Sequence, residues 1–107
     1  MHDAHVSISV DDPGAHVTVA GALSAATVAD VRSTLVAVAE HGSGDLVLDI
    51  SGVDTIDASG LGVLVGAHRL AERRERRLVL CNVPERVGRL LAATRLNRIL
   101  AVEPAVG

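Results

Sequence analysis

A serine stands where the sequence changes from one hydrophobic pattern to another. The apolar run Leu46–Ile50 has the pattern of a strand, and Val63–Ala67 begins a helical spacing. Between them lies Val53–Gly62, a stretch of small and acidic residues that contains Ser59. A serine at a helix start holds its hydroxyl beside free backbone N–H groups. Ser59 is therefore the first candidate for a functional side chain.

Two interpretations of Ser59 remain open from the residues alone. In one, Ser59 or Asp57 simply caps the helix, which is the common role of such residues. In the other, Ser59 accepts a phosphate, which adds about −1.5 to −2 charge. A helix N-terminus tolerates that charge, so the domain stays folded. Asp54 and Asp57 would add to the negative field and repel a docked partner, which makes a switch for binding.

Familiar catalytic patterns fail in this stretch. A nucleophile elbow needs glycines where Asp57 and Leu61 stand, and the spacing of Gly60, Gly62 and Gly66 misses the dinucleotide fingerprint by one residue. The chain has no lysine, which excludes P-loop and Schiff-base chemistry. The five histidines are scattered with no pair at i, i+4, so we expect no metal site and no cofactor. The sequence predicts a protein that is not an enzyme.

Composition indicates a single globular domain and excludes several classes of function. The chain has 107 residues, 49% of them hydrophobic, with no Phe, Trp or Tyr, so the core must be aliphatic. A net charge of −3 argues against nucleic acid as a partner. Cys81 has no second cysteine to pair with, which fits the reducing cytoplasm, and is most simply a core residue. We recognise neither a signal peptide nor a run of about 20 apolar residues in the sequence. We therefore expect neither secretion nor a membrane span.

The first half of the chain predicts a hairpin, a helix and a central strand. His5–Val10 and His16–Ala20 alternate with period two around the turn Asp11–Gly14. A helix follows, with Ser24 as its N-cap and Gly42 as its stop. The three consecutive apolar residues within Asp45–Ile50 predict a strand covered on both faces. The hydrophobic spacing of the helix lies at Val28, Val31, Leu35, Val38 and Ala39.

The second helix should run from Ser59 to about Arg74 and bury one face. That face is expected to contain Leu64, Ala67, Leu70 and Ala71, and the opposite one Gly62, Gly66, Arg69 and Arg73. Each helical glycine costs about 1 kcal/mol relative to alanine. Either the two glycines allow close packing on the sheet, which the spacing slightly favours, or they leave a flat surface for a partner. The arginine-rich run 73–77 is expected to be a solvated helix end.

The remaining residues complete an α/β domain. Leu78–Val83 predicts a strand, Pro84 opens a helix with Val87, Leu90 and Leu91 as its apolar stripe, and Ile99–Val102 is a short edge strand before a tail. The predicted order is ββαβαβαβ, a mixed sheet of about five strands with helices packed on it. We expect one domain over residues 1–107, with a core of about 5–102.

A resemblance rests on two stretches already described. Asp57–Leu64, together with the preceding Leu46–Ser51, resembles the signature of the STAS domain of bacterial anti-sigma factor antagonists. In that family an apolar strand ends in Asp and D-S-S-G-L-G follows at a helix start. The hairpin, the first helix and the strand at 77–83 fall where the family places them, and Leu96–Leu100 is similar to its late segment. The resemblance covers nearly the whole chain.

The resemblance implies a partner-switching function in the cytoplasm. The unphosphorylated domain would bind a serine-kinase anti-sigma factor, which then releases its sigma factor. The kinase would phosphorylate Ser59 and end the interaction, and a PP2C-type phosphatase would restore it. ATP belongs to the kinase, and neither nucleic acid nor membrane is a partner. The chain itself would be a monomer or a weak homodimer.

Three departures from the family pattern bear on the partner. Gly21–Ser24 stands where the family reads G-E-L-D, Ala58 replaces the serine before the phosphosite, and the C-terminal helix of many members is expected to be short or absent. The alternative function is a STAS scaffold subunit without a phosphoswitch, in a stress-signalling assembly or beside a membrane transporter. The expected partner-binding residues are Ser24, Asp57, Ala58, Gly60, Leu61, Gly62, Gly66 and Arg69.

Overall fold

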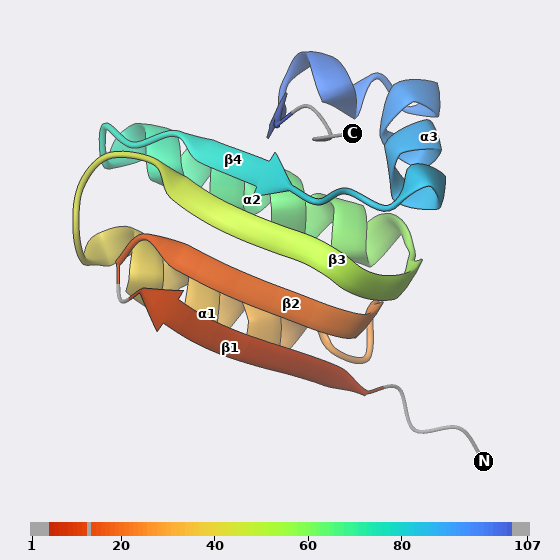
Figure 1. Ribbon diagram of the computed structural model, residues 1–107, viewed down its shortest axis with the longest axis horizontal. Coiled ribbons are helices and arrows are strands. Elements are labelled where there is room, and N and C mark those ends of the chain that lie inside the picture. The colour runs from red at the N-terminus through yellow and green to blue at the C-terminus, as the bar shows by residue number, and fades with distance from the viewer. Residues whose placement is uncertain (1–4, 13, 104–107) are drawn as a thin grey trace.

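A computed structural model describes residues 5–12 and 14–103 as a five-stranded sheet with three helices (Figure 1). Pro13 of the expected turn and residues 104–107 of the expected tail lie outside the described residues. The elements are, in order, β1 (Val6–Asp12), β2 (His16–Leu23), α1 (Val28–Glu40), β3 (Leu46–Ile56), α2 (Ala58–Arg73), β4 (Leu78–Cys81), α3 (Glu85–Ala93), a 3-10 turn η1 (Leu96–Arg98) and β5 (Ala101–Val102).

The sheet is mixed, as the sequence predicts. The strands follow one another in chain order, from β1 at one edge to β5 at the other. β1 and β2 pair antiparallel, which confirms the hairpin, and every later pair is parallel. Parallel neighbours need a crossover, and α1, α2 and the segment from α3 to η1 supply the three crossovers.

The core lies between one face of the sheet and the two helices α1 and α2. Both helices pass behind the sheet in Figure 1, whereas α3 lies beside the end of β4. The side chains of this core are aliphatic, in agreement with the absence of aromatic residues. The largest are Val17, Val19 and Leu23 of β2, Val31 and Leu35 of α1, Leu46, Leu48 and Ile50 of β3, Leu64 of α2, Leu78 and Leu80 of β4, and Leu91 of α3.

The prediction that the central strand is covered on both faces is wrong. Leu46, Leu48 and Ile50 are buried, but Val47 and Asp49 between them are only half-buried. The reason is that α1 and α2 cover the same face, and no helix among the described residues lies across the other face in Figure 1. We call this second face the open face; it carries the alternate residues of β2, β3 and β4.

β3 continues where the sequence predicts a turn. It pairs with β2 as far as Leu23 and Ile56, and two register shifts absorb the irregular segment. At Gly52 an added Cβ would lie 2.6 Å from the Cβ of Ala20, so only glycine lets the two strands remain adjacent there. The acidic stretch therefore extends the central strand, and Asp57 follows its C-terminal end.

The helix boundaries agree with the predictions more closely than the caps do. Ser24 is not the N-cap of α1, because the chain first makes a turn and Thr27 precedes the helix. The buried Thr27 hydroxyl accepts from the Ser24 N–H at 3.0 Å and donates to the Ala22 carbonyl at 2.7 Å. Pro84 is the N-cap of α3 and not its first residue. The C-cap of α1 is His41, in extended conformation, and Gly42 follows it at φ 82°, so the helix ends two residues before the predicted stop.

Arg76 contradicts the expectation of a solvated arginine run. Arg73, Arg74 and Arg77 are exposed, but Arg76 is only 5% exposed. Its guanidinium donates to five backbone carbonyls. These belong to Gly14, to Val38, Ala39 and His41 at the end of α1, and to Gly44. A cation at the negative end of the helix dipole is favourable, so Arg76 caps α1 from a distant part of the chain.

Candidate functional site

Ser59 is exposed at the second position of α2, directly after the end of β3. The preceding Asp57 is the N-cap, and its Oδ1 accepts from the Gly60 N–H at 3.0 Å. The helix begins here because an aspartate in extended conformation satisfies the first free N–H groups. The sequence therefore located both the helix start and the exposed serine within one residue.

Asp57 also joins two segments that are distant in the sequence. Its Oδ2 accepts from the Ala25 N–H at 3.1 Å, in the loop between β2 and α1. Its own N–H donates to the Leu23 carbonyl at 3.3 Å. The N–H groups of Gly60 and then Ala25 lower the pKa of the Asp57 carboxyl. Asp57, which the sequence predicts as a partner-binding residue, therefore connects the loop before α1 to the first turn of α2, beside Ser59.

Gly60 and Leu61 are buried in the structure, and their role as contact residues stays a prediction. A Cβ at Gly60 would stand 2.2 Å from the Leu23 carbonyl oxygen and 2.9 Å from Cγ1 of Ile56. Gly60 therefore allows the first turn of α2 to pack on the end of β2. Ala58 is exposed and Ser24 is half-buried, so both remain on the surface around Ser59.

An exposed stripe runs down α2 from Ser59. Five exposed residues follow one another along this side of the helix, alternately three and four positions apart. They are Ser59, Gly62, Gly66, Arg69 and Arg73. An added Cβ at Gly62 or Gly66 meets no atom within 4 Å. Close packing on the sheet, which the spacing favoured, is therefore wrong as the reason for these glycines. The flat surface is the interpretation that fits the structure.

The two glycines also form one wall of a groove between α1 and α2. The groove has a volume of about 260 Å³ and an apolar floor with an arginine from each helix. Because Gly62 and Gly66 have no side chains, the backbone of α2 is accessible from it. Its lining is Arg32, Leu35 and Val36 from α1, and Gly62, Val63, Gly66, Ala67, Leu70 and Arg73 from α2.

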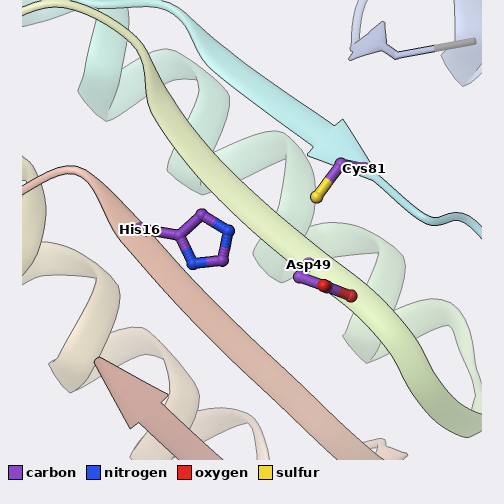
Figure 2. Close-up of side chains that lie close together, drawn as sticks. All are labelled: His16, Asp49 and Cys81. Carbon is purple, nitrogen blue, oxygen red and sulfur yellow. The ribbon is translucent and has the colours of Figure 1, made fainter. Parts of the chain in front are cut away.

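A second cluster lies on the open face. His16, Asp49 and Cys81 belong to β2, β3 and β4, and their ligand atoms all lie within 4.8 Å of one another (Figure 2). Sequence spacing missed this cluster because the three residues are more than thirty positions apart. The signal that would find it is strand register, in which Thr18 pairs with Asp49 and Asp49 pairs with Cys81.

Within the described residues, every helix is too short or too polar to cross a membrane. The groove beside the Ser59 stripe is lined mainly by aliphatic side chains. The geometry therefore concentrates the features suited to a protein partner around α2.

Comparison with known proteins identifies the family of the chain. The family model described as "Mlab, STAS domain" matches residues 6–102. An anti-sigma-B factor antagonist of Staphylococcus epidermidis is 31% identical over 86 residues, which are 80% of each chain.

Two solved structures share the fold. An anti-sigma factor antagonist from Mycobacterium paratuberculosis superposes with a TM-score of 0.83 at 20% identity, covering 95% of this chain and 88% of that one. The antagonist SpoIIAA in its unphosphorylated form gives 0.72 at 16% identity, covering 94% and 89%. The chain belongs to the STAS domain family, and its curated relatives are anti-sigma factor antagonists.

Proposed function

We propose that this chain is an anti-sigma factor antagonist that is switched by phosphorylation of Ser59. Its unphosphorylated form binds a serine-kinase anti-sigma factor, and the bound kinase releases its sigma factor. The observation that carries the proposal is the exposed Ser59 hydroxyl at the start of α2, at the head of a stripe with two unpacked glycines. The names of the curated relatives support the class of partner.

The partner docks on the stripe and the groove beside it. An apolar segment enters between α1 and α2, where Gly62 and Gly66 let it approach the helix backbone. Arg32 and Arg73 line the same groove and favour acidic groups at the edges of that segment. The loop containing Ser24 extends this surface, because the Ala25 N–H donates to Asp57 next to Ser59.

Phosphorylation changes the charge of this surface without unfolding it. The phosphate adds about −1.5 to −2 charge at a helix N-terminus, where the dipole favours an anion. Asp57 is already engaged with two N–H groups, so the helix start keeps its cap. The head of the stripe becomes strongly negative, and a partner that must desolvate there is repelled. A PP2C-type phosphatase removes the phosphate and restores binding in the cytoplasm.

The test combines ATP, the purified chain and each serine-kinase anti-sigma factor of the same cell. Intact mass counts the phosphates, and peptide mapping locates them. We expect one phosphate, on Ser59, that is absent from Ser59→Ala. The matched control is Ser33→Ala, which removes an exposed serine of α1 and should leave phosphorylation unchanged.

Three results would contradict parts of the proposal. A stable complex that never gains phosphate would make the chain a STAS scaffold without a switch. If no kinase forms a complex or transfers phosphate, the antagonist function is wrong. The chain acts by binding, so catalytic turnover by the chain alone would also contradict it.

A further inference from the structure

The cluster of His16, Asp49 and Cys81 has no part in the proposed switch. It lies on the open face of the sheet, and the Ser59 stripe lies on α2, behind the opposite face (Figures 1 and 2). Each of the three side chains comes from a different, adjacent strand. Strand pairing therefore holds the three donor atoms near one another, and no flexible loop separates them.

We propose that His16, Asp49 and Cys81 together bind one borderline-soft divalent cation of the zinc class. An imidazole nitrogen, a carboxylate oxygen and a thiolate form a ligand set that zinc accepts, with water in the fourth position. With metal–ligand bonds of about 2.0–2.3 Å, tetrahedral ligands stand roughly 3.4–3.7 Å apart. The donor atoms lie within 4.8 Å of one another, and small rotations of the side chains would bring them to the distances of a tetrahedral site.

His16 is oriented for this role by Asp11. The Oδ2 of Asp11 lies 3.2 Å from Nδ1 of His16, and it also accepts from the Thr18 hydroxyl at 2.8 Å. With Nδ1–H donating to Asp11, the lone pair of Nε2 is free for a cation. Figure 2 shows the outer ring nitrogen on the side toward Asp49 and Cys81. A carboxylate behind a ligating histidine is a recurrent feature of zinc sites.

Hydrogen bonds also hold the carboxylate of Asp49 in place. Its Oδ1 accepts from the Ser51 N–H at 2.9 Å, and its Oδ2 accepts from the Asn82 side-chain amide at 2.9 Å. Although burial raises the pKa of Asp49, these hydrogen bonds lower it overall. The carboxylate is therefore ionised near neutral pH, and each oxygen keeps a second lone pair.

The charge around Cys81 favours a cation. Burial raises the pKa of the thiol, and the negative charges of Asp49 and Glu103 raise it further. The same negative field attracts a divalent ion, which reverses the preference for the neutral thiol. As the sulfur–metal bond forms, the thiol proton passes to solvent. Thiolate and carboxylate then balance the two positive charges of the ion.

Cobalt(II) provides the direct probe, because it occupies zinc sites and is coloured. Titration of the reduced, metal-free chain should give a thiolate-to-cobalt charge-transfer band and the visible bands of tetrahedral cobalt. An equivalent of Zn²⁺ should remove both. Cys81→Ser should abolish the charge-transfer band, and His16→Gln and Asp49→Asn should each weaken affinity by at least tenfold. Asp11→Asn, which changes the support of His16, should weaken it about 10- to 100-fold.

Matched controls separate the cluster from general metal binding. His5→Gln and Asp30→Asn change exposed residues outside the cluster and should leave the titration unchanged. The proposal is overturned if native protein gives no charge-transfer band. It is also overturned if His16→Gln and Asp49→Asn bind cobalt as tightly as native protein, which would indicate adventitious binding to the thiol alone.

A measurement on the native chain tests the proposal even if the variants do not fold. Zn²⁺ added to ¹⁵N-labelled protein should shift the ring nitrogen signals of His16 and leave those of His5 in place. Unchanged His16 signals at saturating Zn²⁺ would overturn the proposal.

Discussion

At each end of the parallel strands, one charged side chain connects neighbouring segments by hydrogen bonds. At one end this side chain is a buried cation, and at the other it is an exposed carboxylate. At the end where the strands begin, buried Arg76 donates to five carbonyls from three segments. At the end where β2 and β3 finish, exposed Asp57 accepts from two N–H groups beside Ser59. Arg76 is therefore shielded from solvent, whereas Asp57 and Ser59 are both exposed to it.

This difference explains how one small domain can be stable and still be switched. A charge added at the Arg76 end would enter a buried network of carbonyls, where desolvation is costly. A charge added at Ser59 enters solvent and a helix N-terminus, where it is tolerated. The comparison predicts that changes at the first end alter stability and that changes at the second alter binding.

Arg76→Met should produce the largest loss of stability. It leaves five carbonyls without their donor, and we expect the free energy of unfolding to fall by about 3 kcal/mol or more. Urea denaturation measures the change. The control Arg77→Met removes an exposed arginine paired with Asp45 at 3.1 Å and should cost less than about 1 kcal/mol. Equal losses for the two variants would remove the contrast between the ends.

Gly60→Ala should be the next most damaging change. The new Cβ would stand 2.2 Å from the Leu23 carbonyl oxygen, so the backbone must move. Overpacking of this kind costs about 1–3 kcal/mol. The start of α2 moves with it, so Ser59 phosphorylation should also slow. Native stability in this variant, measured by thermal and urea unfolding, would show that the contact is not tight.

Asp57→Ala should make a smaller and pH-dependent difference. Because the folded pKa of Asp57 lies below its ordinary value of about 3.9, its carboxylate stabilises the fold above that pH. The contribution is lost as the pH falls through the folded pKa. Native protein should therefore exceed the variant in stability at pH 7, and the gap should shrink at pH 3. A gap that stays constant between these pH values would contradict the role of the ionised cap.

Gly66→Ala should have the smallest effect, and of opposite sign. The added methyl meets no atom within 4 Å, so the helix gains about 0.5–1 kcal/mol. Gly66→Leu at the same place should keep the fold but weaken partner binding, because its side chain occupies the groove. Undiminished binding by the leucine variant, measured by calorimetry, would remove the groove from the proposed interface.

The features that local chemistry determines were predictable from the sequence. The helix start near Ser59 depends on a few neighbouring residues, and α2 begins one residue earlier, at Ala58, with Asp57 as the N-cap of the two candidates. The order of strands and helices follows from hydrophobic periodicity, which is also local. The glycines at 62 and 66 were located correctly, but their surroundings needed the position of α1.

The features that depend on distant segments were not predictable. Arg76 lies in a run that resembles a solvated helix end, and its acceptors come from the end of α1 and from loops up to 62 positions away. His16, Asp49 and Cys81 meet only through strand register. The open face of β3 could not be foreseen from three consecutive apolar residues, because it depends on α1 and α2 lying on the same side of the sheet.

The most direct test of the account is the affinity of the anti-sigma partner for Ser59→Asp and Ser59→Ala. Calorimetry measures binding, and thermal unfolding checks that both variants keep the native fold. We expect Ser59→Ala to bind as native protein does and not to be released by ATP. We expect Ser59→Asp to bind much more weakly at unchanged stability. Native affinity in Ser59→Asp would contradict a charge switch at the start of α2.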